Sequence, residues 1–177
     1  MRILFAIALL TGGLASAEIL ESGPGGFRVK TTLIIKVPPE DVYRKFVHQI
    51  GDWWNPQHTF SGDSHNLRIE EHPGGCFCEK LPNNGFSRHL EVILLAPGKR
   101  MVMSGALGPL QLLAAVGTMS VQFAQEGAGT KFEVIYSVSG YLEKGINTWA
   151  IPVDLMTSEQ FYRFKRYVET GQPAESK

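Results

Sequence analysis

The sequence TKFEVIYSVSGYLEKGINTWAIPVDLMTSEQFYRFKRYVETG, residues 130–171, changes its hydrophobic period halfway along. Up to Tyr141 apolar residues alternate with polar ones, which indicates a half-buried strand. From Gly145 they recur every three or four residues, which is typical of an amphipathic helix. Pro152 predicts a kink or a fresh start within that helix, and Gly171 predicts its end. The inward residues would be Phe132, Val134, Tyr136 and Val138 in the strand, and Ile146, Trp149, Val153, Met156, Gln160, Phe164 and Tyr167 in the helix.

Shorter elements separated by turns precede this unit. Residues 27–37 alternate as a strand does, and Pro38-Pro39-Glu40-Asp41 suits the first turn of a helix that we expect to end at Gly51. Further strand candidates lie near residues 66–71, 76–81, 88–95, 100–105, 118–125 and 130–141, with short turn-forming links that favour an antiparallel meander. We therefore predict an α+β fold: a curved antiparallel sheet of about seven strands wraps a long C-terminal helix, with a cavity between them.

The N-terminus has the three parts of a cleavable secretory signal. Arg2 supplies a positive charge, residues 3–10 are apolar, and Ala15-Ser16-Ala17 forms a small-residue cleavage site. The apolar run is shorter than the roughly 20 residues that span a bilayer. We expect an exported protein, periplasmic or secreted. It would comprise a signal peptide at 1–17, a flexible lead-in at 18–26, one domain at 27–171 and a tail at 172–177.

The charge balance narrows the choice of partner. Without the signal, 160 residues remain, with 16 basic and 17 acidic side chains. No basic patch is interleaved with aromatic residues, so nucleic acid is not an expected partner. The near-neutral balance also disfavours a strongly charged ligand attracted by long-range fields. We expect a small hydrophobic molecule as partner, no integral membrane span and no cofactor. The sequence leaves the oligomeric state open.

Several short motifs, spread from residue 27 to about residue 171, resemble those of one protein superfamily. They are Val37-Pro38-Pro39-Glu40-Asp41-Val42-Tyr43, Trp53-Trp54-Asn55-Pro56, Gly74-Gly75-Cys76-Phe77-Cys78-Glu79, Ala96-Pro97-Gly98-Lys99-Arg100 and Gly129-Thr130-Lys131-Phe132. At these motifs the chain resembles the SRPBCC superfamily, the START-like or helix-grip proteins. It looks closest to the branch labelled after activators of a heat-shock ATPase and after polyketide cyclases. The resemblance implies a hydrophobic ligand cavity between sheet and C-terminal helix, and it carries over no shared catalytic motif. The signal peptide argues against the cytosolic co-chaperone role in the branch label.

Aromatic and polar side chains are the candidates for contacting a ligand. Trp53 and Trp54 offer large rings with an N–H each, although at least one is expected to pack beneath the first helix. His58 either orients a polar ligand group or lies in a surface loop. Tyr136 would hydrogen-bond a ligand or an internal water, and Asp154 would face inward or cap the helix after Pro152. The full set of ligand-binding candidates is Trp53, Trp54, His58, Met103, Leu110, Phe132, Tyr136, Val138, Val153 and Asp154.

Glu79 and His89 are the candidates for an acid–base pair, because they lie in neighbouring predicted strands. Strand parity places Glu79 on the face of Phe77 and Leu81. The same parity places His89 opposite the face of Leu90 and its apolar neighbours, which would split the pair across the sheet.

The two cysteines, Cys76 and Cys78, share one face of a predicted strand. Bridging them would close a very small ring, so we favour packing residues, with pairing under oxidation as the alternative. His65, His72, Cys76, Cys78, Glu79 and His89 lie within a short span, but they lack the paired spacing of a zinc site. We predict no metal site.

Three functional readings follow. The first is a carrier or sensor of a hydrophobic or amphipathic ligand, because no nucleophile–base pair stands at useful spacing. The second is a cyclase- or hydrolase-type enzyme acting on a small hydrophobic substrate, which would need two titratable groups facing the cavity. The third is a protein-interaction module that uses the uncharged apolar segment 107–113, which would otherwise form a flap over the cavity or a core-covering loop.

Overall fold

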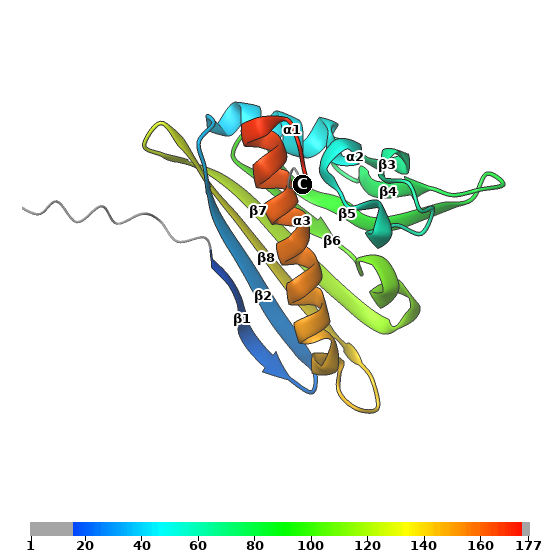
Figure 1. The fold of residues 1–177 in the computed structure, drawn as a ribbon. Helices are drawn as coiled ribbons and strands as arrows, with labels where there is room; N and C mark the ends of the chain where they lie inside the picture. The colour runs from blue at the N-terminus through cyan, green and yellow to red at the C-terminus, as the bar shows by residue number, and fades with distance from the viewer. Residues whose placement is uncertain (1–15, 175–177) are drawn as a thin grey trace, which may run out of the picture.

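The computed structural model describes residues 16–174 of the chain, so most of the expected signal peptide lies outside the described residues. Within them, one antiparallel sheet has the strand order β1-β2-β8-β7-β6-β5-β4-β3. The strands are β1 (Ser16–Gly23), β2 (Gly26–Ile35), β3 (Leu67–Ile69), β4 (Cys76–Lys80), β5 (Phe86–Ala96), β6 (Arg100–Ser104), β7 (Ala114–Glu126) and β8 (Gly129–Tyr141). The sheet curves around the long C-terminal helix (Figure 1). The predicted α+β architecture is confirmed.

The helices cover the inner face of this sheet. They are α1 (Pro39–His48), α2 (Ile50–Trp53) and α3 (Ala150–Thr170), and the 3-10 turns are η1 (Pro56–His58), η2 (Ser64–Asn66), η3 (Gly108–Leu112) and η4 (Ile146–Trp149). Figure 1 shows α3 crossing β2 and β8, with α1 and α2 at one end of the molecule. The fresh start expected near Pro152 is present, because η4 ends and α3 begins at Ala150. None of the helices in residues 16–174 is long and apolar enough to cross a membrane.

Two expectations near the N-terminal half need correction. The first helix ends at His48, and the chain turns directly into α2, which includes Gly51 and Trp53. Residues 18–26, expected as a flexible lead-in, instead form most of β1 and its turn into β2. Backbone pairing with β2 orders this segment, although its side chains are mostly exposed and therefore carry little of the alternation that marks a half-buried strand.

An aromatic cluster joins the helices to the sheet. Phe132 of β8 lies 5.2 Å from Phe164 of α3, and Trp53 of α2 lies 4.8 Å from the same ring, measured between ring centroids. Phe46 of α1 stacks on Trp53 at 5.6 Å. All four side chains are at most 2 % exposed. This cluster fixes α3 and the α1–α2 corner against the same part of the sheet.

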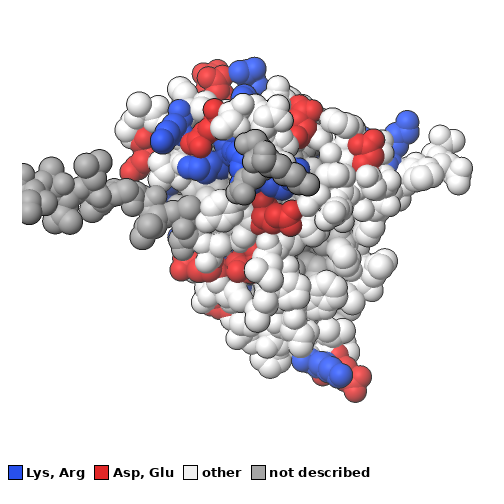
Figure 2. All heavy atoms as spheres, viewed as in Figure 1, with Lys and Arg blue, Asp and Glu red and all other residues white. Residues whose placement is uncertain are grey.

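The outer face of α3 differs along its length. Figure 2 shows charged side chains gathered near α1 and the C-terminal part of α3, whereas the face over the first half of α3 is largely uncharged. Ile151 and Leu155 lie in that first half and are 64 % and 66 % exposed. The apolar character of α3 is therefore not confined to the side that packs on the sheet.

The strand β5 contains two irregularities in register, one against β4 and one against β6. The first lies between Phe77 and Cys78 of β4, where His89 of β5 has no partner. The second lies between Val92 and Leu94, where Ile93 has no partner in β6. An extra residue of this kind is a β-bulge, which bends the strand and re-aims the side chains beside it. The first bulge decides the geometry of the site described below.

The aromatic cluster predicts a large stability loss when one ring is removed. We expect Phe132→Ala to lower the free energy of unfolding by about 3–5 kcal/mol, because a fully buried ring leaves a cavity in a packed core. Phe86→Ala is the matched control, since Phe86 is 72 % exposed, and its effect should stay within about 0.5 kcal/mol. Urea denaturation measures both. Equal losses would contradict this assignment of the core.

Candidate functional site

A cavity of about 170 Å³ opens between α3, the α2–η2 loop, the strands β3–β5 and η3. Most of its wall is apolar. The lining residues are Trp54, Gln57, His58, Thr59, Phe60, Leu67, Phe77, His89, Leu107, Gly108, Pro109 and Met156. The cavity therefore lies between the sheet and the C-terminal helix, toward the β3–β5 edge.

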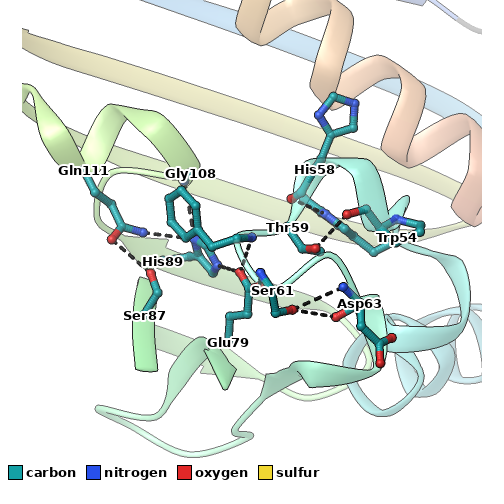
Figure 3. A network of polar contacts seen from close by, with 12 residues as sticks. Trp54, His58, Thr59, Ser61, Asp63, Glu79, Ser87, His89, Gly108 and Gln111 are labelled. Carbon is teal, nitrogen blue, oxygen red and sulfur yellow. Dashed lines mark hydrogen bonds and ion pairs between the residues drawn. The ribbon is translucent and has the colours of Figure 1, made fainter. Parts of the chain in front are cut away.

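A buried carboxylate, Glu79 at the end of β4, lies behind the cavity wall. Its side chain is 0 % exposed. One carboxylate oxygen accepts a hydrogen bond from the backbone N–H of Phe60 at 3.1 Å, and the other accepts from the N–H of Ser61 at 2.5 Å. A third donor is the His89 ring, whose Nε2 lies 3.0 Å from Oε2 of Glu79 (Figure 3). Buried carboxylates need such donors, and here they come from a loop and a neighbouring strand.

His89 faces Glu79 because of the bulge in β5. Phe77 pairs with Leu90, but the next residue of β4, Cys78, pairs with Arg88. His89 is therefore the extra residue, and both it and Leu90 are buried, at 4 % and 1 % exposure. The predicted split of Glu79 and His89 across the sheet is wrong for this reason. Simple alternation cannot anticipate an inserted residue.

The second ring nitrogen of His89 is also occupied. Its Nδ1 lies 3.0 Å from the Gln111 side-chain nitrogen and 3.4 Å from the backbone N–H of Gly108, and both groups come from η3. The hydroxyl of Ser87 donates to the other end of the Gln111 amide at 3.1 Å. With Nδ1 accepting and Nε2 donating to a carboxylate, the ring is the neutral Nε2–H tautomer. Figure 3 shows this chain of contacts running from Ser87 to Glu79.

The pKa values of the pair fit this assignment. Burial raises the pKa of the Glu79 carboxyl, but hydrogen bonds from Ser61, Phe60 and His89 outweigh burial and hold that pKa below its ordinary value. Burial lowers the pKa of His89 by more than the attraction of Glu79 raises it. At neutral pH the pair is therefore a carboxylate beside a neutral imidazole.

Hydrogen bonds to α3 fix the loop that bears Phe60 and Ser61. The Asn55 backbone N–H donates to the Gln160 side chain at 2.8 Å, and the Asn55 side-chain amide donates to Glu159 at 2.5 Å. Nε2 of His58 lies 3.0 Å from the other oxygen of Glu159. The indole N–H of Trp54 donates to the His58 carbonyl at 3.1 Å. These bonds orient the loop, so that its N–H groups point at Glu79 and its side chains line the cavity.

The segment 107–113 covers the cavity and is held in place from below. The Leu107 N–H donates to the Tyr136 hydroxyl at 2.9 Å, and that hydroxyl donates to the Gly105 carbonyl at 3.2 Å. Leu107 and Leu110 are buried, at 4 % and 1 % exposure, whereas Leu112 is 83 % exposed. Leu107, Gly108 and Pro109 therefore form one wall of the cavity, and Leu110 anchors the segment in the core.

The structure brings some predicted ligand contacts to the cavity and places others elsewhere. Trp54 and His58 line the cavity, as does His89 from the predicted acid–base pair. Tyr136 supports the cover from behind, and Val138 lines a shallow surface depression near β1. The other core candidates are buried outside the cavity wall; they are Trp53, Met103, Leu110, Phe132 and Val153.

Asp154 also lies outside the cavity wall. One of its carboxylate oxygens is buried without a hydrogen-bond partner among the described residues, and burial raises the pKa of this carboxyl.

Sequence reasoning missed several cavity residues. Phe77 shares the predicted face of Glu79, and Met156 lies in the predicted helical stripe, so periodicity held a signal for both. Phe60, Leu67 and Gly108 lie in or beside loops, where no period applies.

The cysteines form a disulfide between Cys76 and Cys78, so the favoured reading of two free packing thiols is wrong. Both remain buried, at 8 % and 2 % exposure. In the described part of the chain, no three His, Cys, Asp or Glu side chains gather as a metal site.

The Glu79–His89 pair makes stability depend on pH. An unfolded histidine binds a proton below its ordinary pKa of 6.5, whereas buried His89 resists protonation, so the unfolded state gains protons first as pH falls. Glu79 adds a further loss below 4.5, the ordinary pKa of its carboxyl. We expect the free energy of unfolding in urea to decrease from pH 7.5 to pH 5.5. His89→Gln should flatten this slope, whereas the exposed control His65→Gln should not. Parallel slopes for the two variants would contradict the assignment.

Comparisons with known proteins identify the fold. No protein family and no curated protein matches the sequence. A conserved protein of unknown function from Enterococcus faecalis superposes with a TM-score of 0.59 at 15% identity, over 91% of this chain and 82% of that chain. DynU16, from the dynemicin biosynthetic locus, gives 0.57 at 14%, over 84% and 49% of the two chains. Ara h 8.0201 gives 0.54 at 15%, over 81% and 98%. With its curved antiparallel sheet wrapped on the long helix α3, the chain has a helix-grip fold.

Proposed function

We propose that this protein is an exported binding protein that holds a small hydrophobic or amphipathic molecule in the cavity between sheet and α3. The observation that carries the proposal is the cavity itself, whose wall is mostly apolar with a few polar groups. Such a combination is typical of small-molecule sites.

The size of the cavity limits the ligand. A dry apolar cavity of about 150 Å³ accepts benzene, whereas drug-sized ligands occupy roughly 300–1,000 Å³. At about 170 Å³, this cavity fits a molecule with one aromatic ring or a short branched chain. Trp54 and Phe77 lie with their ring centroids 5.4 Å apart at 75° and offer both an edge and a face to such a ring.

The polar groups in the wall favour a neutral ligand. Gln57, His58 and Thr59 belong to the η1 loop, and His89 is neutral at physiological pH. Glu79 lies behind the wall, where its charge is already met by His89, Phe60 and Ser61. None of these five groups carries an unpaired charge that a ligand of opposite charge would neutralise. A hydroxyl or carbonyl on the ligand therefore suits the site better than an ionised group.

Two features support export, and a set of short motifs supports the narrower family assignment. The signal at residues 1–17 and the Cys76–Cys78 disulfide both suit an oxidising compartment, periplasmic or extracellular. The motifs around Trp53-Trp54 and Gly74-Gly75 favour the SRPBCC superfamily and, within it, the branch labelled after heat-shock ATPase activators and polyketide cyclases. We propose that the protein derives from this branch but does not act as a cytosolic co-chaperone.

The Glu79–His89 pair favours a second candidate, a cyclase- or hydrolase-type enzyme acting on a small hydrophobic substrate. A carboxylate that orients a histidine in one tautomer is a common arrangement for a general base. Binding remains the first reading because Nδ1 of His89 already accepts hydrogen bonds from Gln111 and Gly108 and is not directed at a substrate.

Native mass spectrometry of the protein purified gently from its own host, followed by organic extraction, tests the binding function. We expect a neutral compound of about one ring to co-purify with the mature chain. Consumption of an added extract component, with products released, would favour the enzyme instead. A protein that neither retains nor converts any extract component would contradict both.

Toluene and phenol test the cavity directly. We expect both compounds to bind, which calorimetry would detect as heat and NMR as a shift of the Met156 methyl signal. Trp54→Ala should weaken their binding about tenfold or more, because the variant loses the contact with the indole ring. Trp149→Ala is the matched control, because Trp149 packs against the core away from the cavity wall. Equal weakening by the two variants would place the binding site elsewhere.

A further inference from the structure

We propose that protonation of His89 loosens the segment 107–113 that covers the cavity, so that acid lowers the affinity for the ligand. The movement of this cover follows from the geometry around His89, and the effect on the ligand rests on the proposed binding function. Three features carry the proposal: the acceptor role of Nδ1 of His89, the place of Gly108 in the cavity wall, and the fixed base of the cover.

With its ring neutral, His89 holds the cover through Nδ1 as a hydrogen-bond acceptor. Nδ1 lies 3.0 Å from the side-chain nitrogen of Gln111 and 3.4 Å from the backbone nitrogen of Gly108, and both residues belong to η3. A protonated imidazole carries a hydrogen on each ring nitrogen and accepts no hydrogen bond. Nδ1–H would then face two N–H groups, so protonation turns an attraction between His89 and η3 into a repulsion.

The two donors respond differently to this reversal. The Gln111 amide can turn over, because its oxygen then accepts from Nδ1–H and its nitrogen donates to the Ser87 hydroxyl, which serves as donor or acceptor. The backbone N–H of Gly108 has no second group to present, so it loses its partner and moves away. Protonation therefore acts at Gly108, which lines the cavity between Leu107 and Pro109.

The contact between His89 and Glu79 persists when the ring is protonated. Nε2–H of His89 faces Glu79 Oε2 at 3.0 Å and donates in either state of the ring, and a positive imidazole is attracted more strongly by a carboxylate. Among the described residues, Glu79 is the one titratable group bonded to His89. Protonation therefore strengthens the β4 side of the ring and weakens the η3 side.

The other described groups around His89 carry no free charge. The rings of Phe60 and Phe77 lie 5.6 Å and 5.2 Å from the imidazole, measured between centroids. On β5 itself, Arg88 and Glu91 form an ion pair at 2.7 Å. Burial holds the pKa of His89 below 6.5, its ordinary value, so the cover stays closed at neutral pH.

The proton has a route to the ring that does not pass through the cavity. His89 lines the cavity and also borders a surface depression, together with Ser104, Gly105, Ala106 and Gln111. Water in this depression is close to the Nδ1 side of the ring, where Gln111 lies. The ring can therefore take up a proton while a ligand occupies the cavity.

The cover can loosen without leaving the fold. Its base is fixed, because the Leu107 N–H donates to the Tyr136 hydroxyl at 2.9 Å. Gly105 and Gly108, on either side of that base, have φ values of 148° and 58°, and glycine enters this region readily. Leu110 is 1 % exposed and remains an apolar anchor. We therefore expect a loosened cavity wall at Gly108 and not a detached cover.

Nitrogen-15 NMR of the His89 ring and hydrogen exchange of the Gly108 amide, recorded on the mature chain from pH 7.5 to pH 4.5, test the movement. We expect His89 to take up a proton below pH 6.5. Exchange at Gly108, corrected for its intrinsic pH dependence, should accelerate with the same midpoint, while the core amide of Phe132 stays protected. Toluene affinity should fall about tenfold across the transition, because toluene favours the closed wall.

Two charge variants separate the role of Nδ1 from a general effect of charge. Gln111→Glu places a carboxylate opposite Nδ1 and favours the protonated ring, so the midpoints of His89 and Gly108 should both rise by about one pH unit or more. Gln57→Glu is the matched control, because Gln57 lines the cavity but makes no hydrogen bond to His89 among the described residues. Its midpoints should stay close to those of the unaltered protein.

Several outcomes would overturn the proposal. They are protonation of His89 with unchanged exchange at Gly108, equal shifts in Gln111→Glu and Gln57→Glu, and loss of Phe132 protection at or above the pH at which His89 takes up its proton. A constant toluene affinity while Gly108 loosens would overturn the effect on the ligand. Absence of toluene binding at pH 7.5 would instead count against the binding function, and exchange at Gly108 would still decide the movement of the cover.

Discussion

The buried carboxylate of Glu79 is the constraint on which the site depends. A fully buried charge without partners would be too costly to keep, and this one has three donors from two separate parts of the chain. The loop after η1 supplies the N–H groups of Phe60 and Ser61, and β5 supplies the ring of His89. By requiring these donors, Glu79 draws a loop and two strands together on the side of the sheet that faces α3.

The same constraint extends outward from the carboxylate to the cover of the cavity. His89 donates to Glu79 with one nitrogen and accepts from η3 with the other, so its tautomer decides whether Gln111 and Gly108 can bind it. The result is a small, neutral, mostly apolar cavity whose wall combines rigid strands with a hydrogen-bonded loop and cover. Such a site suits a compact hydrophobic ligand.

Much of the fold could be predicted from periodicity, because β8 and α3 bury one clear face each. Phe132, Val134 and Tyr136 alternate as a strand requires, and the structure buries all three. β1 was missed because its side chains are mostly exposed and backbone pairing alone holds it to the sheet.

For the site, the sequence identified Trp54, His58, Glu79 and His89. It could not reveal that the last two meet, because one inserted residue reverses the parity of β5. The disulfide was not favoured from the sequence because a bridge between cysteines separated by one residue closes a very small ring, yet the structure forms it.

The decisive measurement is the ionisation of Glu79, because the ordering of the loop and of His89 depends on its negative charge. Carbon-13 NMR of the side-chain carboxyl groups, recorded through an acid titration with Glu79→Gln to assign the signal, measures it in the folded protein. Because hydrogen bonds hold the pKa of Glu79 below its ordinary value of 4.5, we expect its side chain to remain a carboxylate at pH 4.5 and to take up a proton only at lower pH. A Glu79 carboxyl that protonates above pH 4.5 would mean that burial outweighs its donors. The carboxylate could then not be the element that orders the loop and fixes the tautomer of His89.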